Sequence, residues 1–394
     1  MPIYFDHHAT TPVDERVLDA LLPYLRTSFG NAASRVHTHG EEAREAVERA
    51  REQVARLLDG RADEVVFTSG ATESNNIALL GALVQADGTA RGHVITQATE
   101  HPAVLDTCAE LERRGADVTR LPVDAFGRVS AAQLSEAMRD DTTLVSIMRC
   151  NNEVGTVHDI DALARVPRPH GALFHCDAAQ GLGLLPLSVR ETPIDLVSVS
   201  GHKLYAPKGV GALWVRRSAR QRLRPSVFGG GHEQGLRSGT LNVPGIVGLG
   251  AAAELAHAQG ATDARRIAAL RDRLWAHLST LDELRRFGDP QHAHPGNLNV
   301  GFGYVDVPAL LLALAPFVSV SSGAACSTLK ASPSHVLLAL GAPPEWLRSG
   351  VRFGLGRGTT EAEVDEVAKR TVDAVRAQRE RSPAYRARGK VIDW

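Results

Sequence analysis

The sequence has no hydrophobic run long enough to cross a membrane. Its longest apolar stretch, 309–320, is interrupted by Pro316 and is shorter than the ~20 residues that a spanning helix requires. The first residues, 1–6, do not form the basic segment followed by an apolar segment that is typical of a secretory signal. We therefore expect a cytoplasmic protein with no membrane partner.

Cysteine is also scarce, and the four cysteines stand alone at positions 108, 150, 176 and 326. The lack of a Cys-x-x-Cys pair argues against a zinc site and against a disulfide framework. His7 and His8 are adjacent, but two neighbouring histidines alone do not make a metal site, so we expect no metal. Each cysteine is then either a small buried residue or a reactive thiol.

An excess of positive charge is missing as well. The 44 lysines and arginines are balanced by 45 acidic residues, and nucleic-acid binding needs a basic surface. We therefore expect no nucleic-acid partner. A length of 394 residues predicts two or three domains, each with a sizeable core.

Six short apolar runs, each followed by polar residues, predict the strands of the first domain. They are nearly uniformly apolar, as expected of strands that are covered on both faces. Helical patterns lie between them, for example at 104–114 and 131–138. This alternation predicts an α/β domain with a mostly parallel sheet, whose ligands bind at the carboxyl ends of the strands. The predicted strands are 64–68, 93–96, 143–148, 172–176, 195–199 and 211–215.

The pattern changes after residue 250. A long helical stretch at 251–284 is followed by shorter elements that mix strands with helices. We therefore predict a large α/β domain at 13–255 and a smaller α+β domain at 256–394, which also includes residues 1–12. The elements predicted in the smaller domain are strands at 297–300, 318–320 and 351–353, and helices at 307–314 and 361–379.

Lys203 is a candidate reactive amine, because it comes directly after a predicted strand. A lysine in a pocket at a strand end can become nucleophilic when burial lowers its pKa, and pyridoxal phosphate needs such an amine. Taken alone, a lysine in this position is more often a surface residue. Asp177 ends the preceding strand and suits the acid that pairs with the pyridine nitrogen. A helix cap is an equally good reading of Asp177.

The segment 69–75 lies between a predicted strand and a helix. Its N–H and hydroxyl groups, including those of Ala71 and Thr72, suit a phosphate at a helix N-terminus. It is neither a Walker A loop nor a dinucleotide-binding loop, and a simple helix cap is the alternative. Ser200 and His202, beside Lys203, would add phosphate contacts. These residues together predict a site for pyridoxal 5'-phosphate.

Seven motifs in one order carry a family resemblance. The chain resembles the cysteine desulfurases of iron–sulfur cluster assembly, from Tyr4 to its end. That resemblance implies the aspartate-aminotransferase-like fold, type I among pyridoxal-phosphate enzymes. The motifs are Ser69-Gly70-Ala71-Thr72-Glu73-Ser74, Thr99-Glu100-His101, Asn151-Asn152-Glu153-Val154-Gly155, Asp177-Ala178-Ala179-Gln180, Ser200-Gly201-His202-Lys203, Arg237-Ser238-Gly239-Thr240 and Ser321-Ser322-Gly323-Ala324-Ala325-Cys326.

The resemblance implies roles around the cofactor. Lys203 would hold it covalently, and Asp177 would pair with the pyridine nitrogen. Gln180 would donate a hydrogen bond to the phenolic oxygen, while His101 would stack on the ring and assist proton transfer. The phosphate would be bound by Thr72, Ser200 and His202, together with Thr240 of the partner subunit. The active enzyme would therefore be a homodimer.

The resemblance also implies that the substrate is L-cysteine. Asn152 and Arg352 would bind its carboxylate, which suits the planar fork of a guanidinium. Cys326 would take up the sulfur as a persulfide, leave alanine, and pass the sulfur to an iron–sulfur scaffold or another acceptor protein. The small residues before Cys326 predict a loop that can carry the thiol between these positions.

Other readings remain open from the residues. Cys108 and Cys176 fall inside a predicted helix and strand, so we expect them in the core, while Cys150 lies near Asn151 and Asn152 and is less certain. An aminotransferase or epimerase would keep the fold and cofactor, but transamination needs no thiol at Cys326. A selenocysteine lyase, or a sulfur-relay protein that mainly binds partners, is the remaining alternative.

Overall fold

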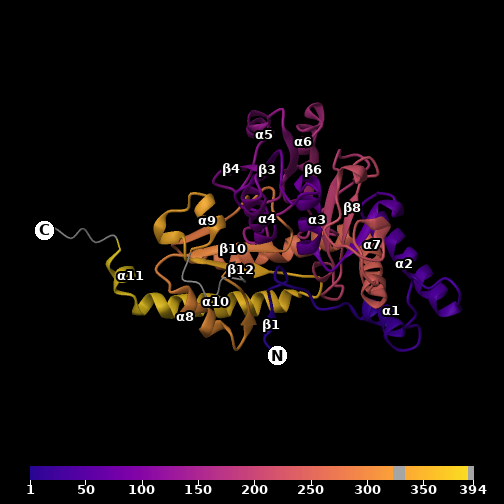
Figure 1. Ribbon diagram of the computed structural model, residues 1–394. Coiled ribbons are helices and arrows are strands. Elements are labelled where there is room, and N and C mark those ends of the chain that lie inside the picture. The colour runs from indigo at the N-terminus through magenta and orange to yellow at the C-terminus, as the bar shows by residue number, and fades with distance from the viewer. Residues whose placement is uncertain (323–332, 389–394) are drawn as a thin grey trace.

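The structure is a computed structural model that describes residues 1–322 and 333–388 (Figure 1). Cys326 lies outside the described residues. A seven-stranded sheet has the order β2-β8-β7-β6-β5-β3-β4. β8 is antiparallel to its neighbours, and the other neighbouring pairs are parallel. The strands are β2 (Val65–Thr68), β3 (His93–Gln97), β4 (Asp117–Leu121), β5 (Thr142–Ser146), β6 (Leu173–Asp177), β7 (Leu196–Ser200) and β8 (Gly211–Val215).

Six of these strands confirm the sequence prediction to within two residues at each end. The prediction missed β4. This strand lies at the edge of the sheet, and Asp117 and Arg120 are exposed while Leu121 is buried. A half-exposed edge strand does not show the uniformly apolar pattern by which the central strands were recognised.

Helices cover both faces of the large sheet, because successive side chains of a strand point to opposite faces. On one face, α3 and α4 pack against Val66, Val94 and Leu144. On the other face, helices pack against Phe67, Ile95 and their neighbours. The helices of the second face are α1 (Glu15–Arg26), α2 (Thr38–Leu57), α5 (Ala131–Ala137), α6 (Ile160–Arg165) and part of α7 (Val243–Leu278), opposite α3 (Ala71–Leu83) and α4 (Pro102–Arg113).

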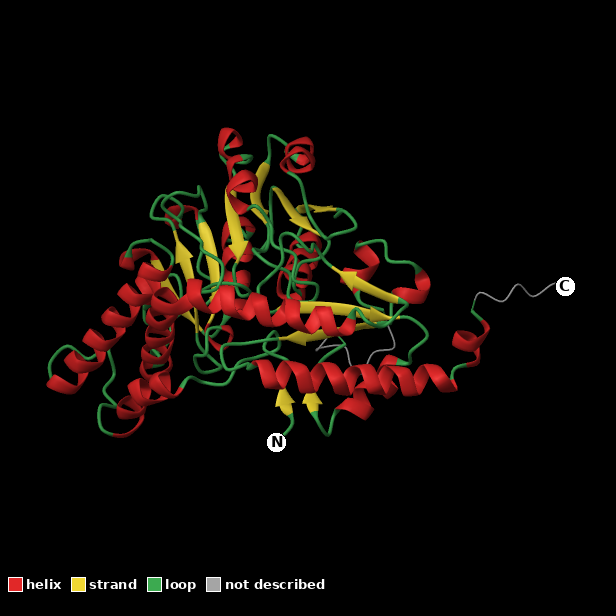
Figure 2. Cartoon of the chain, turned by 180° about the vertical axis from the view of Figure 1, so that it is seen from behind, coloured by secondary structure: helices red, strands yellow, loops and turns green. Residues whose placement is uncertain are grey.

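A second core surrounds a three-stranded antiparallel sheet of order β12-β10-β9. The C-terminal half of α7 packs into this core together with α8 and α10, and the two long helices α7 and α10 run side by side (Figure 2). The elements of this part are β9 (Leu284–Phe287), β10 (Asn297–Phe302), β12 (Gly350–Gly354), α8 (Val307–Leu314) and α10 (Glu361–Arg381).

The long helix α7 links the two cores. Ala256 is its last residue in the first core and Ile267 is its first in the second. The domain boundary at 255/256 falls close to this change and stays a prediction. The helix begins at Val243, earlier than the predicted residue 251, after the N-cap Asn242. Glycines early in the helix hid this start, since glycine disfavours helices.

The remaining elements are short. β1 (Ile3–Tyr4) pairs in parallel with β11 (Val318–Ser319), which brings the N-terminus to the smaller sheet's side of the molecule. None of the helices in the described ranges combines the length and apolar character needed to cross a membrane. The other elements are α9 (His335–Ala339), α11 (Pro383–Ala387) and the 3-10 helices η1 (Ala62–Glu64), η2 (Arg168–His170), η3 (Gly201–Lys203), η4 (Arg220–Arg222), η5 (Glu233–Gly235) and η6 (Pro344–Trp346).

The close approach of α7 to the loop after β6 gives a test of this packing. A Cβ on Gly260 would lie 1.8 Å from the Gly183 carbonyl oxygen, so the backbone would have to move. The overpacking cost of about 1–3 kcal/mol exceeds the ~1 kcal/mol that alanine adds in helix propensity. We expect Gly260→Ala to lower the free energy of unfolding in urea. Gly358→Ala is the control, because open space surrounds Gly358; equal stability of the two variants would contradict the prediction.

Candidate active site

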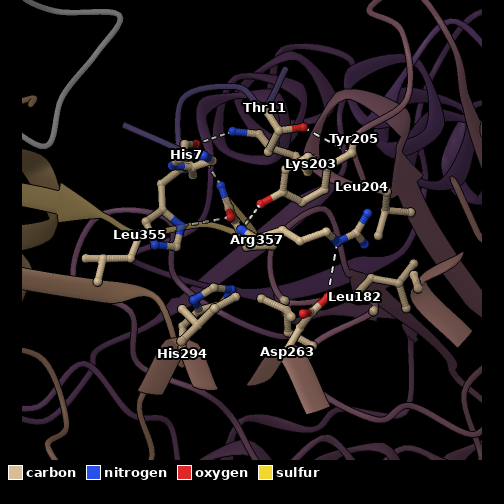
Figure 3. A pocket seen from close by; sticks show the side chains of 17 residues that line it. His7, Thr11, Leu182, Lys203, Leu204, Tyr205, Asp263, His294, Leu355 and Arg357 are labelled. Carbon is tan, nitrogen blue, oxygen red and sulfur yellow. Dashed lines mark hydrogen bonds and ion pairs between the residues drawn. The ribbon is translucent and has the colours of Figure 1, made fainter. Parts of the chain in front are cut away.

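The carboxyl ends of two neighbouring parallel strands define the site. β6 ends at Asp177 and β7 at Ser200, and the two strands pair directly. The 3-10 helix η3 follows β7 and carries Lys203, whose amine Nζ donates to the backbone carbonyl of His8 and to that of Ala9 at 2.9 Å. The N-terminal segment therefore lies across the strand ends, where Figure 3 shows Lys203 beside His7 and Thr11.

Asp177 is buried, and two donors hold its carboxylate. Asn75 Nδ2, from α3, donates to one oxygen at 2.7 Å, and the Ala179 amide donates to the other at 2.9 Å. The Ala179 contact agrees in part with the helix-cap reading, although turns rather than a helix follow β6. A carboxylate that is fixed in this way is suited to accept a further hydrogen bond from a ring N–H.

His101 caps the N-terminus of α4, where its Nδ1 accepts a hydrogen bond from the Ala103 amide at 3.0 Å. Because Nδ1 accepts, a neutral ring carries its proton on Nε2. Burial lowers the pKa of His101, nearby Lys203 and His335 lower it further, and Asp177 opposes them. The fold thus brings His101, Lys203 and Asp177 close enough to interact electrostatically.

The predicted phosphate loop forms the N-terminus of α3. Gly70 is the N-cap with φ of 150°, and it offers no side-chain cap, so the first N–H groups of the helix are left for another acceptor. Thr72 is exposed in the first turn. A Cβ on Gly70 would meet nothing within 4 Å. The loop therefore faces open space, as a phosphate cradle requires.

Of the other predicted phosphate ligands, Ser200 and His202 lie at the same edge of the large sheet, and Thr240 is exposed. Ser200 ends β7 and is buried. His202 Nδ1 lies 3.1 Å from Thr10 Oγ1, and burial, helped by Lys203 and Lys208, lowers its pKa to about 4. A neutral His202 can donate one N–H to an anion. Thr240 is exposed, and its place in a partner's site stays a prediction.

The two predicted carboxylate ligands are in contact. Arg352 lies in β12 with 1% of its surface exposed, and its Nη1 donates to the backbone carbonyl of Asn152 at 2.9 Å. Its Nη2 donates to Asp6 Oδ1 at 2.7 Å. Asp6, for which no role was expected from the sequence, thus occupies the guanidinium that a substrate carboxylate would use.

Gln180 forms hydrogen bonds with His8, for which no role was expected from the sequence. Its Nε2 donates to the His8 carbonyl at 3.0 Å, and its Oε1 lies 3.1 Å from His8 Nδ1. A cavity of about 40 Å³ is lined by His8, Gln180, Lys203 and His294, among others (Figure 3). That volume holds water molecules rather than a cofactor.

The three described cysteines are buried. Burial raises the pKa of Cys108 and of Cys150 to about 12, and it raises the pKa of Cys176 still further. The core positions expected for Cys108 and Cys176 are confirmed, and Cys150 joins them. A thiol with such a pKa is not a nucleophile near neutral pH. Within residues 1–322 and 333–388, no group of three or more metal-ligating side chains is found.

The donor set fits pyridoxal phosphate. An amine, a buried carboxylate with two fixed donors and an imidazole lie together at the strand ends, and an uncapped helix N-terminus opens onto free space. These are the groups that such a cofactor needs for its aldehyde, its pyridine nitrogen, its ring face and its phosphate.

The chain is similar to known proteins over nearly its whole length. Residues 3–367 match the family described as aminotransferase class-V. The "Cysteine desulfurase IscS" of Anaeromyxobacter sp. (strain Fw109-5) is 54% identical over 98% of this chain and 95% of that protein. The protein of the same name from Shewanella sp. (strain MR-4) is 50% identical over the same shares.

Two solved structures are similar to this chain over nearly their whole length. The "NIFS-LIKE PROTEIN" has a TM-score of 0.88 and 36% identity, covering 96% of this chain and 100% of that one. "SspA in complex with cysteine" has a TM-score of 0.80 and 37% identity, covering 91% and 100%. With these matches, the chain belongs to the pyridoxal-phosphate-dependent class-V aminotransferase family and, within it, to the cysteine desulfurases.

Proposed function

We propose that this cysteine desulfurase takes the sulfur of L-cysteine onto Cys326, releases L-alanine and passes the sulfur to an acceptor protein. The observation that carries the proposal is the position of Asp177 and Lys203 at the carboxyl ends of the paired strands β6 and β7, with His101 near enough for both to affect its pKa. One of the similar structures is described as a complex with cysteine, which supports cysteine as the substrate here.

Pyridoxal phosphate supplies an electron sink that stabilises negative charge at the substrate's α-carbon. Asp177 would pair with the pyridine nitrogen and favour its protonated form, and His101 would contact the ring. Thr72, Ser200, His202 and the N–H groups around Ala71 bind the phosphate. These assignments rest on the donors and on the open space described at the strand ends.

Lys203 has two tasks in the proposed reaction. It would hold the cofactor covalently, and its amine, when free, would remove the α-proton of L-cysteine. Arg352 and Asn152 bind the substrate carboxylate, which displaces Asp6 from the guanidinium. The Cys326 thiolate attacks the substrate sulfur. The carbon–sulfur bond breaks, a sulfur–sulfur bond forms on Cys326, and protonation of the remaining carbon skeleton gives alanine.

We further propose that the enzyme is a homodimer. Thr240 is exposed on the single chain, so it is accessible to a partner subunit. Large apolar side chains that one chain leaves exposed, namely Phe29, Val36 and Phe228, suggest a surface that a second copy covers. The unpaired thiols Cys108, Cys150 and Cys176 suit a reducing compartment, in keeping with the cytoplasm.

The final acceptor in this proposal is an iron–sulfur scaffold or another sulfur-accepting protein. We propose that the C-terminal tail, which begins with the last described helix, α11, docks this acceptor. Tyr385 donates to Asp282 at 2.8 Å, and Arg388 pairs with the same carboxylate at 2.5 Å. These contacts hold the chain as far as Arg388, on the surface at the end of the long helix α10 (Figure 1).

The role of Cys326 gives the first test. Cys326→Ser should keep the cofactor's visible absorbance and lose sulfide and alanine production by more than about 100-fold, because no other described thiol is ionisable near pH 7. Both products are measured with L-cysteine and a reductant. Cys108→Ala is the matched control and should keep activity. Sulfide release by Cys326→Ser would remove Cys326 from the reaction.

The attachment of the cofactor gives the second test. Borohydride reduction followed by peptide mapping should find the cofactor on the peptide that contains Lys203. Lys203→Ala should give no attachment, since its amine is the one held at the strand ends. Lys208→Ala, five residues further on, should label as the unaltered protein does. Labelling of any other lysine would refute the assignment.

The carboxylate site gives the third test. Arg352→Lys keeps the charge but loses the planar fork, so the KM for L-cysteine should rise about 10–100-fold, in line with 1.5–3 kcal/mol for a charged hydrogen bond. Steady-state kinetics measure the change, and the cofactor's absorbance should stay the same. Arg348→Lys, in the neighbouring loop, is the control. An unchanged KM would show that the carboxylate binds elsewhere.

A further inference from the structure

His8 lies between two groups of the active site. It belongs to the segment that crosses the carboxyl ends of β6 and β7, and its side chain is buried. Its backbone carbonyl accepts hydrogen bonds from Gln180 Nε2 at 3.0 Å and from Lys203 Nζ. One carbonyl thus contacts the amine that holds the cofactor and the amide expected at its phenolic oxygen.

The side chain of His8 closes a ring of hydrogen bonds with Gln180. Its Nδ1 lies 3.1 Å from Gln180 Oε1, while the amide nitrogen of Gln180 donates to the carbonyl of the same residue. Rotating the amide by 180° would bring two oxygens together at the carbonyl and two N–H groups together at Nδ1. His8 therefore favours one of the two orientations of Gln180.

The tautomer of His8 supports this orientation. Burial holds its pKa well below the usual value, and His294, Arg352 and Lys203 lower it further, so the ring carries one proton. Gln180 Oε1 can only accept, so the proton belongs on Nδ1. His8 Nε2 is buried and has no hydrogen-bond partner among the described residues. A proton on Nε2 would therefore leave a buried donor unsatisfied, which is costly.

We propose that His8 is a positioning residue that orients Gln180, so that Gln180 presents an N–H rather than its carbonyl to the phenolic oxygen of pyridoxal phosphate. An amide nitrogen carries two hydrogens; the His8 carbonyl takes one, and the other is directed to the cofactor. The inference rests on the proposed function, because it needs the cofactor on Lys203.

The consequence is a change in the pKa of the chromophore that Lys203 forms with the cofactor. A donor at the phenolic oxygen stabilises its negative charge and so weakens the attraction of that oxygen for a proton on the neighbouring nitrogen. Losing the donor should raise this pKa. A hydrogen bond to a charged group corresponds to about one pH unit.

The experiment is a pH titration of the visible absorbance of the holoenzyme. His8→Phe removes the Nδ1 donor at similar size but keeps the backbone carbonyl that accepts from Gln180, so the titration midpoint should move up by at most about one unit. His8→Asn keeps an N–H near the position of Nδ1 and should restore the original midpoint. Gln180→Leu, which loses the amide altogether, should raise the midpoint at least as far as His8→Phe does, and the double variant should shift no further than Gln180→Leu.

The control is His7→Phe. His7 lines the same cavity but bonds to the Gly354 carbonyl instead, so its midpoint should not move. Borohydride labelling of Lys203 in every variant separates the two proposals: failure to label would defeat the proposed function. If Lys203 is labelled normally and the titration midpoint of His8→Phe does not move, the proposed role of His8 is wrong. The same holds if the midpoints of His8→Phe and His8→Asn move equally.

A second measurement reads the protonation of His8 in the unaltered protein. Nitrogen-15 NMR of histidine-labelled holoenzyme, with His8 assigned by comparison with His8→Asn, reports which ring nitrogen carries the proton. Protonation at Nδ1 is expected. Protonation at Nε2 would overturn the inference, because Gln180 would then have to present the opposite orientation.

Discussion

The N-terminal segment joins the two sheets at the point where the chemistry takes place. Its carbonyls at His8 and Ala9 accept from Lys203, while Asp6 pairs with Arg352 of the smaller sheet. The His7 amide adds a bond to the Gly354 carbonyl. Because one short segment binds both parts, the amine proposed to hold the cofactor and the guanidinium proposed to bind the substrate keep a fixed relative position. Proximity of this kind is a main source of catalytic rate.

Burial leaves the site with neutral imidazoles and permanent cations. It lowers the pKa values of four histidines, and it raises that of Glu100 with help from Asp177. The anions of the reaction, a phosphate and a substrate carboxylate, therefore meet donors and cations rather than competing charges. Asp6 lies against Arg352, and its partly exposed position would let it leave when a substrate carboxylate binds. The four histidines are His8, His101, His202 and His294.

The sequence predicted what local pattern can reveal. Buried strands such as β7 are uniformly apolar, and polar residues at their ends, such as Asp177 and Lys203, indicate a ligand site. The roles of Asp6 and His8 were missed, since each depends on a partner more than 170 residues away and no local pattern marks it. The edge strand β4 was missed because its side chains are half-exposed. The order of strands in the sheet is likewise a property of tertiary contacts.

The segment that carries Thr240 is anchored before any partner meets it. Glu233 accepts from both terminal nitrogens of Arg51 at 2.9 Å and from the Phe67 amide at 2.7 Å. Further along, Arg237 donates to Glu73 at 2.9 Å, and Glu73 lies next to Thr72 in the phosphate loop. A segment held at two points loses less freedom on association, which favours a dimer. Through the pair Glu73–Arg237, the proposed phosphate loop also supports the segment that carries Thr240, which is proposed to reach the partner subunit.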